Sequence, residues 1–211
     1  MNSETKLRDA IARLAKSMYD RGLTVGSSGN ISVRLDDGWL MTPTGSTMGC
    51  LDPRRISKLD DGGVFISGDP PTKETFLHRA MYEMRPGTGA VVHLHSTHSV
   101  AVSCLKDIDP KNVLPPITAY YVMRIGTLPQ IPYFPPGDIK LANAVREMAS
   151  KHHAVLLANH GPVVTGTTLE DAVYATEELE ETAKLFLMLK NLNTSFLTDE
   201  QVVTLKNKFP T

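Results

Sequence analysis

The sequence predicts a single α/β domain of three layers, in which helices cover both faces of a mixed or antiparallel sheet. Segments with helical periodicity alternate with short β-branched runs, as in α/β folds. Turn signals join the early strands as a hairpin, which favours antiparallel pairing. The length of 211 residues fits one large domain more simply than two small ones.

The first part of the chain is predicted to form a helix, a hairpin and a second helix. A helix is expected from about residue 3 to 21, with Gly22 as its stop. The stretch GSSGNISVRL then enters a strand, WLMTPTG returns as a second strand and turn, and residues 36–38 connect them. VFISG is expected to be another short strand, and a helix should run from about 72 to 84. The first helix rests on the apolar residues Leu7, Ile11, Leu14, Ala15 and Met18.

The second part begins with the β-branched strand GAVVHLHS, followed by a helix in THSVAVSCL. Residues 107–137 are rich in proline, so loops and short strands are expected there. Asp138 is expected to cap a helix that reaches about residue 151. HAVLLAN is a buried strand, GPVVTG a turn and short strand, and Thr167 with Glu170 forms a capping box for a long last helix.

Composition excludes several classes of function. The formal net charge is −1, with 41% hydrophobic and 21% charged residues, so nothing indicates a nucleic-acid or anionic membrane partner. The N-terminus has no apolar segment typical of a signal peptide, and no apolar run reaches the roughly 18 residues of a membrane span. Cys50 and Cys104 match no CxxC pattern, which favours a cytoplasmic protein with reduced thiols.

The stretch VVHLHSTHSV carries three histidines in an apolar setting. Residues i and i+2 of a strand project from one face, so His93 and His95 are expected to point the same way and to suit one cation. Catalytic zinc usually has three protein ligands and one open position. His160 is the best third ligand, because it ends an apolar strand and precedes the turn at Gly161. The alternative is a structural or exposed H-x-H, which is the more common occurrence.

Other titratable residues near this pattern have competing interpretations. Glu74 precedes the H-x-H strand and is either a fourth ligand and general base or an acid that interacts with a helix dipole. His98 is expected to pack or to support the site. His78, on a predicted helix, and His152 and His153, in a loop, are not expected to be ligands.

Small polar loops indicate a phosphate site. Ser27 and Asn30 lie in SSGN, and Thr44 and Gly45 lie in TPTG, where glycine and exposed N–H groups can surround an anion. Residues 72 and 73, at a predicted helix start, add a hydroxyl, a cation and free N–H donors. Ordinary turns are the alternative for each loop taken alone, and neither is a Walker loop.

Five segments of this chain together resemble the class II aldolase/adducin family: GNISVR, MTPTG, PPTKETFLHRAMY, AVVHLHSTHSVAVS and LLANHGPVVTG, in this order. The resemblance covers nearly the whole chain and implies a single α/β/α domain, residues 1–211, around a mainly antiparallel sheet. It also implies a homotetramer with active sites between neighbouring subunits.

The resemblance assigns roles position by position. His93, His95 and His160 match the ligands of one Zn²⁺ per subunit. Glu74 matches an acid that can bind zinc and that accepts and donates a proton, and Tyr120 falls where aldolases of the family have a tyrosine that assists proton transfer. The matches to the phosphate-binding positions are Ser27, Asn30, Thr44, Gly45, Thr72 and Lys73.

Departures from the family pattern refine the expected activity. Fuculose-phosphate aldolases have S-S-E where this chain has T-K-E, the epimerases have Asp at position 74, and no tyrosine follows Tyr174 to match the aldolase tail. The segments HLHSTHS, PPTKETF and YYVMRIGTLPQIPYFPPGD are most similar to the 3-oxo-tetronate 4-phosphate decarboxylases of acid-sugar catabolism. The resemblance therefore implies release of CO₂ and dihydroxyacetone phosphate through a zinc-stabilised enediolate. A sugar-phosphate aldolase of the fuculose type is the alternative, and a non-catalytic adducin-like interaction module is a third.

Overall fold

The structure, a computed structural model, describes residues 3–135 and 138–209. Its strands form one eight-stranded sheet in the order β4-β3-β2-β1-β5-β8-β7-β6, and each neighbouring pair is antiparallel except β6 and β7. The strands are β1 (Asn30–Leu35), β2 (Gly38–Met41), β3 (Ser57–Leu59), β4 (Phe65–Ser67), β5 (Ala90–His93), β6 (Gln130–Ile131), β7 (Ala154–Leu157) and β8 (Gly161–Gly166). The predicted mainly antiparallel sheet is confirmed.

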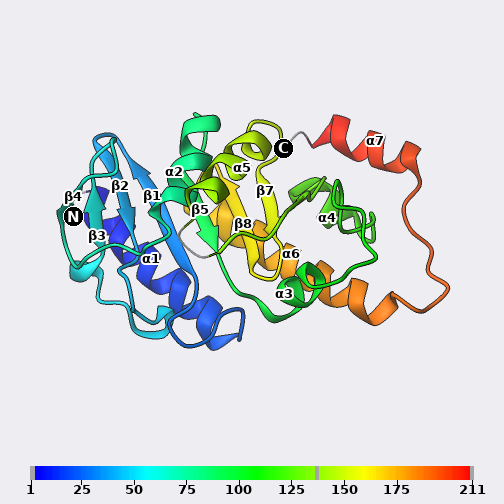
Figure 1. Ribbon diagram of the computed structural model, residues 1–211, viewed down its shortest axis with the longest axis horizontal. Helices are drawn as coiled ribbons and strands as arrows, with labels where there is room; N and C mark the ends of the chain where they lie inside the picture. The colour runs from blue at the N-terminus through cyan, green and yellow to red at the C-terminus, as the bar shows by residue number, and fades with distance from the viewer. Residues whose placement is uncertain (1–2, 136–137, 210–211) are drawn as a thin grey trace.

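Helices cover both faces of this sheet, as Figure 1 shows. The α-helices are α1 (Ser3–Asp20), α2 (Thr75–Met84), α3 (Thr97–Ser103), α4 (Ala119–Arg124), α5 (Ile139–Ala149), α6 (Leu169–Leu189) and α7 (Asp199–Lys208). Two short 3₁₀ helices, η1 (Met48–Cys50) and η2 (Pro53–Arg55), lie between β2 and β3. The predicted three-layer α/β/α class is confirmed.

The alternation of buried residues along β5 builds the two cores. Val92 packs in a cluster with residues of α1 and α6, whereas Val91 packs with residues of α2 and α5 on the opposite face. His93 follows with the parity of Val91, so its side chain lies on the face that α2 covers. The sheet therefore directs this histidine toward the start of α2.

Several local predictions are confirmed. Residues 36 and 37 alone separate the paired ends Leu35 and Gly38, as expected for a tight hairpin. The Asp138 side chain accepts a hydrogen bond from the N–H of Lys140 and so caps α5. The first helix ends at Asp20, one residue before its expected limit.

Four element predictions need correction. Helix α2 begins at Thr75 and not at 72, because residues 70–72 are held in a bridge with the 42–44 loop. Strand β5 ends at His93, so His95 lies beyond the sheet hydrogen bonds. The cap of α6 is Thr168, which accepts from the N–H of Asp171, one position later than the predicted capping box. GPVVTG is a full six-residue strand, β8, paired on both sides.

Two helices were not predicted. Helix α4 interrupts the proline-rich region, and its N-cap Thr118 accepts from the N–H of Tyr121. Helix α7 begins at a capping box of Thr198 and Gln201. It packs against α4, and Val202 and Leu205 contact a further core cluster that includes Tyr121, Val122 and Leu179.

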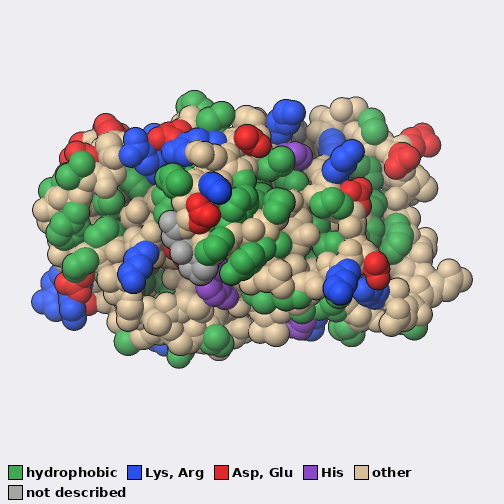
Figure 2. Space-filling view, in the orientation of Figure 1, with side chains coloured by type: hydrophobic (Ala, Val, Ile, Leu, Met, Phe, Trp, Pro, Cys, Tyr) green, Lys and Arg blue, Asp and Glu red, His purple; other side chains and the backbone are tan. Residues whose placement is uncertain are grey.

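The face of the molecule drawn in Figure 2 shows no broad field of one charge. Lys and Arg side chains are interspersed with Asp and Glu across the face drawn in Figure 2. Among the described helices, none has the length and apolarity that crossing a membrane would require.

Candidate metal centre

The side chains of four predicted residues converge at the C-terminal end of β5. Ligand atoms of Glu74, His93, His95 and His160 all lie within 4.8 Å of one another. The Nε2 atom of His95 is 3.1 Å from that of His93 and 3.0 Å from that of His160. The Glu74 carboxylate oxygens lie 3.5 Å from Nε2 of His93 and 3.4 Å from Nε2 of His160.

Each residue comes from a different local structure. His93 is the last residue of β5, and His95 lies two residues further along the extended chain. His160 ends the turn between β7 and β8, where its N–H bonds the carbonyl of Leu157. Within that turn Asn159 has φ 55°, a left-handed conformation that asparagine tolerates better than most residues.

Two glycines permit the backbone approaches that bring these loops together. Gly29 has φ +79°, and a Cβ there would lie 2.9 Å from the carbonyl oxygen of His93. A Cβ on Gly161 would lie 2.2 Å from the carbonyl oxygen of Leu94. Larger residues at these positions would push the segments that carry Asn30 and His160 away from the chain at His93 and Leu94. This explains the glycines in the G-N and H-G pairs of the sequence.

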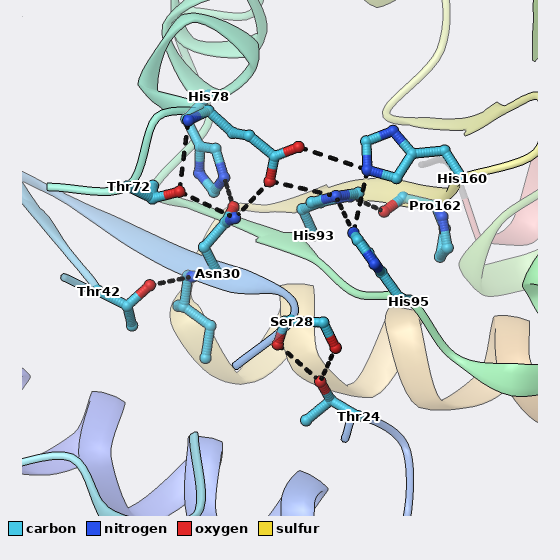
Figure 3. A network of polar contacts seen from close by, with 12 residues as sticks. Thr24, Ser28, Asn30, Thr42, Thr72, His78, His93, His95, His160 and Pro162 are labelled. Atoms are coloured by element: carbon cyan, nitrogen blue, oxygen red, sulfur yellow. Dashed lines mark hydrogen bonds and ion pairs between the residues drawn. The ribbon is translucent and has the colours of Figure 1, made fainter. Parts of the chain in front are cut away.

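The orientation of His93 leaves its Nε2 free to bind a metal. Its Nδ1–H donates to the carbonyl oxygen of Pro162 at 2.8 Å, so the neutral ring carries its lone pair on Nε2 (Figure 3). Burial, with the nearby His160, lowers the pKa of His93. Burial, with His93 and His160 nearby, lowers the pKa of His95 to about 4. Both rings are therefore neutral at physiological pH, as metal ligands must be.

Glu74 is held as a carboxylate. Burial alone would raise its pKa, but the hydrogen bond with His160, the nearby His93 and the hydrogen bond from Asn30 outweigh it and lower the pKa. A dication bound by the histidines would favour the ionised carboxylate further. Glu74 occupies the N-cap position of α2 without a side-chain capping bond. The interpretation of Glu74 as a helix-dipole acid is therefore less favoured than a role in the cluster.

The donors present fit a divalent metal ion. Imidazole nitrogen with one carboxylate oxygen is a common set for zinc and for related transition metals. Two zinc–nitrogen bonds of about 2.0–2.1 Å at a tetrahedral angle place their nitrogens roughly 3.3 Å apart. The measured separations of 3.0 and 3.1 Å between the ring nitrogens are close to that spacing.

The candidate phosphate-binding residues lie in neighbouring loops, and only some contact one another. The Nδ2 of Asn30 lies 3.4 Å from Oγ1 of Thr72 and 2.7 Å from Oε2 of Glu74. Hydrogen bonds from Thr44 N to Pro70 O and from Thr72 N to Thr42 O join the two loops. Thr44, Gly45 and Ser27 are exposed, and Ser27 lies in the turn that precedes Asn30.

Lys73 and Tyr120 stand apart from the cluster. Lys73 is exposed, and within the described chain it has no hydrogen bond or ion pair. Tyr120 is 60% exposed on α4, a helix that packs against α6 and α7. Among the described residues no hydrogen bond links Tyr120 to the four clustered side chains, so its predicted role remains a prediction.

The sequence alone does not reveal the cleft beside the cluster or the residues that hold Glu74 in place. A cleft of about 600 Å³ opens beside His95 and His160, and Tyr133 and Phe134 form part of its wall. His78 was interpreted only as a non-ligand, yet its ring is buried and hydrogen-bonded to Asn30. The spacing of Glu74 and His78, four residues apart on one helix, is the signal that could have found it.

Comparison with known proteins places this geometry in a family. Residues 9–187 match the Class II Aldolase and Adducin N-terminal domain. A Haemophilus influenzae 3-oxo-tetronate 4-phosphate decarboxylase is 50% identical over 202 residues, which cover 95% of this chain and 96% of that protein. The L-fuculose phosphate aldolase of the same species is 34% identical, covering 99% of this chain and 96% of that protein.

A solved structure agrees with the sequence comparison. The crystal structure of YgbL from Escherichia coli superposes with a TM-score of 0.95 at 46% identity, covering 97% of this chain and 100% of that one. The family match over residues 9–187 includes Glu74 and the three histidines. The chain therefore belongs to the class II aldolase/adducin family.

Proposed function

We propose that this protein is a metal-dependent lyase that decarboxylates 3-oxo-tetronate 4-phosphate to dihydroxyacetone phosphate and CO₂. The convergence of Glu74, His93, His95 and His160 beside an open cleft carries the proposal. The relative of that name shares half of its residues with this chain over nearly the full length of both. The four-residue cluster favours an enzyme over a non-catalytic adducin-like module.

Zinc is the metal that we propose for the cluster, one ion per chain, held by His93, His95 and His160. When bound, it would supply Lewis-acid stabilisation of negative charge on the substrate ketone oxygen. Glu74 lies close enough to be a fourth ligand or to act on the substrate once a ligand position is taken. The neutral state of the His93 and His95 imidazoles supports this assignment.

Substrate binding is assigned to the loops beside the cluster. The exposed Thr44 and Gly45, together with Ser27, present hydroxyl and N–H groups to solvent, where a phosphate can reach them. Lys73 adds a cation with no protein partner to displace in the described chain. Binding energy at the non-reacting phosphate end orients the carboxylate that must leave.

Decarboxylation then requires one proton at carbon. The C1–C2 bond breaks, CO₂ leaves, and the electron pair of that bond remains on C2 and the adjacent ketone oxygen. Glu74 delivers a proton to C2, which completes the hydroxymethyl group of dihydroxyacetone phosphate. The carboxylate of Glu74 must first take up that proton, and its neighbours His95 and His160 line the cleft through which solvent protons arrive.

The aldolase alternative uses the same cluster with a different leaving group. The aldolase relative is 34% identical, compared with 50% for the decarboxylase. This chain also has Lys73 where the fuculose-phosphate aldolases have serine, and no tyrosine follows Tyr174. These differences favour CO₂ over an aldehyde as the expelled group.

A coupled assay tests the proposal. We expect purified, zinc-loaded protein to release one dihydroxyacetone phosphate and one CO₂ from 3-oxo-tetronate 4-phosphate. The Glu74→Gln control, which keeps the size but cannot donate the proton, should lower the rate about 10²–10⁴-fold while the histidines retain the metal. Dihydroxyacetone phosphate released only from L-fuculose 1-phosphate, together with an aldehyde, would support the aldolase instead.

A further inference from the structure

A buried row of polar side chains lies behind Glu74 and is not part of the metal cluster. Helix α2 presents Glu74, His78 and Tyr82 at intervals of four residues, and β1 presents Asn30 and Ser32 at an interval of two. Four helical residues rise about 6 Å and two strand residues about 6.8 Å, so the two rows stay in register. Their side chains alternate between helix and strand and interlock.

Hydrogen bonds join the row from end to end. Asn30 Nδ2 lies 2.7 Å from Oε2 of Glu74, and Asn30 Oδ1 lies 2.5 Å from Nε2 of His78 (Figure 3). Ser32 Oγ lies 2.7 Å from Nδ1 of His78 and 2.8 Å from the hydroxyl of Tyr82. The side chains of Asn30, Ser32, His78 and Tyr82 are at most 7% exposed, so water does not compete for these bonds.

Only one direction of donation satisfies every bond in the row. A carboxylate only accepts, so Asn30 must donate through Nδ2, which turns its Oδ1 toward His78. His78 must then donate through Nε2–H, and its bare Nδ1 accepts from Ser32. Tyr82 in turn donates to Ser32. Burial lowers the pKa of His78 to about 3, in keeping with a neutral ring that can both donate and accept.

We infer that His78 is a positioning residue that acts on Glu74 through the amide of Asn30. Because His78 donates to Oδ1 of Asn30, the Asn30 amide cannot flip. The Nδ2–H of Asn30 therefore always points at Oε2 of Glu74, and a proton on Oε2 that pointed at Asn30 would clash with this donor. The Asn30 donor thereby disfavours protonation of Oε2 and directs proton exchange to Oε1, the oxygen 3.4 Å from Nε2 of His160. This inference rests on the proposed function for its catalytic consequence, but the hydrogen-bond directions stand independently.

Two variants of His78 distinguish the role of its Nε2–H donor from the role of the rest of the ring. In His78→Gln, the amide nitrogen can occupy the place of Nε2 and still donate to Asn30. In His78→Asn, the shorter side chain reaches only the place of Nδ1, so it keeps a partner for Ser32 and loses the donor to Asn30. We expect His78→Asn to lower kcat about 10- to 100-fold, as supporting partners of metal-site residues do, with full metal content and a smaller change in KM.

His78→Gln should keep kcat within about fivefold of wild type, which a merely structural role for the ring would not produce. Equal rates in the two variants, whether both fast or both slow, would overturn the inference. Metal content, measured on each purified variant, separates a displaced carboxylate from a lost metal.

A measurement on the unaltered protein keeps the inference testable if a variant fails to fold. Nitrogen-15 NMR of ring-labelled, metal-free wild type, assigned through the contacts of the His78 ring with Asn30 and Ser32, should show the His78 proton on Nε2 and a bare Nδ1. A proton on Nδ1, or on both nitrogens, would overturn the inference. Absence of CO₂ release by wild type would refute the proposed function alone, because the NMR result does not depend on turnover.

Discussion

His95 is the residue at which the metal assignment is tested with least damage to the fold. It lies beyond the end of β5 and is only half-buried, so truncation opens no cavity in either core. We expect His95→Ala to lose bound zinc and turnover while its unfolding transition remains cooperative. His152→Ala, which removes a half-buried histidine outside the cluster, is the matched control and should keep its metal. Full zinc occupancy in purified His95→Ala would contradict the assignment.

Lys73 tests the proposed phosphate contact. Its side chain is exposed and carries a positive charge near the start of α2, where the helix dipole does not favour a cation. If it binds the substrate phosphate, Lys73→Ser loses a charge-assisted contact worth about 1.5–3 kcal/mol. This corresponds to a loss of roughly 10- to 150-fold in kcat/KM.

The control for Lys73 is a substrate analogue without phosphate, for which the loss should shrink because the partner is missing in both enzymes. Lys151→Ser provides a second control, since that lysine is exposed at the far end of α5. Wild-type kinetics of Lys73→Ser on the phosphorylated substrate would remove this lysine from the site.

Among individual residues, the sequence predicts the candidate metal ligands but not the side chains that position them. The H-x-H and N-H-G patterns predicted His93, His95 and His160 because metal chemistry restricts the residue types and their spacing. The role of His78 could not be predicted in the same way, because a histidine on a helix does not indicate a function until the side chains of the facing strand are known. Its partners Asn30 and Ser32 are more than 40 residues away, and only the pairing of β1 with β5 brings them under α2.

The element that follows His95 is a short helix anchored by one carboxylate. Glu180, on α6, accepts from the N–H groups of His98 and Ser99, and also from the His98 ring and the Ser99 hydroxyl. These four bonds, of 2.7 to 2.9 Å, satisfy the first turn of α3, which has no side-chain cap of its own. The chain is thereby held where His95 leaves the sheet.

We expect Glu180→Ala to lower the free energy of unfolding by about 1–3 kcal/mol, because four donors, two of them on the buried Ser99, lose their acceptor together. Urea denaturation with an unchanged m-value measures this effect. Glu181→Ala is the matched control, since that side chain is 61% exposed and only reaches Lys184 on its own helix. Equal stability of the two variants would mean that water replaces the carboxylate at the start of α3.

The predicted ends of helices and strands agree with the structure where neighbouring residues determine them. They disagree where contacts with distant residues determine them. The Asp138 cap and the hairpin depend on neighbouring residues, and both are confirmed, although Gly38 belongs to β2 and the connection is one residue shorter than the expected 36–38. Helix α4 was missed because prolines surround it, although Thr118 supplies a local cap. The start of α2 was placed early because nothing near Thr72 indicates its hydrogen bond with the loop at Thr42.

At the scale of the whole molecule, Tyr120 raises the question of which site it serves. Helix α4 lies between α6 and α7 and presents this tyrosine to solvent at 60% exposure. An exposed tyrosine without a bond to the cluster of its own chain can still act on the cluster of a neighbour. We therefore predict a homo-oligomer, a tetramer by the family resemblance, in which Tyr120 completes the site of an adjacent subunit.

Mixed oligomers distinguish action within a subunit from action between subunits. Glu74→Gln and Tyr120→Phe should each lower the rate about 10²-fold or more as homo-oligomers. When they are co-expressed in equal amounts, random assembly gives roughly a quarter of the sites a native Glu74 from one subunit and a native Tyr120 from the next. We expect activity to recover toward that fraction.

Co-expression of Glu74→Gln with His95→Ala is the control and should recover nothing, because both residues belong to one cluster and each subunit lacks one of them. Failure of the first mixture to exceed the second, with assembly verified by size, would place Tyr120 outside the neighbouring active site.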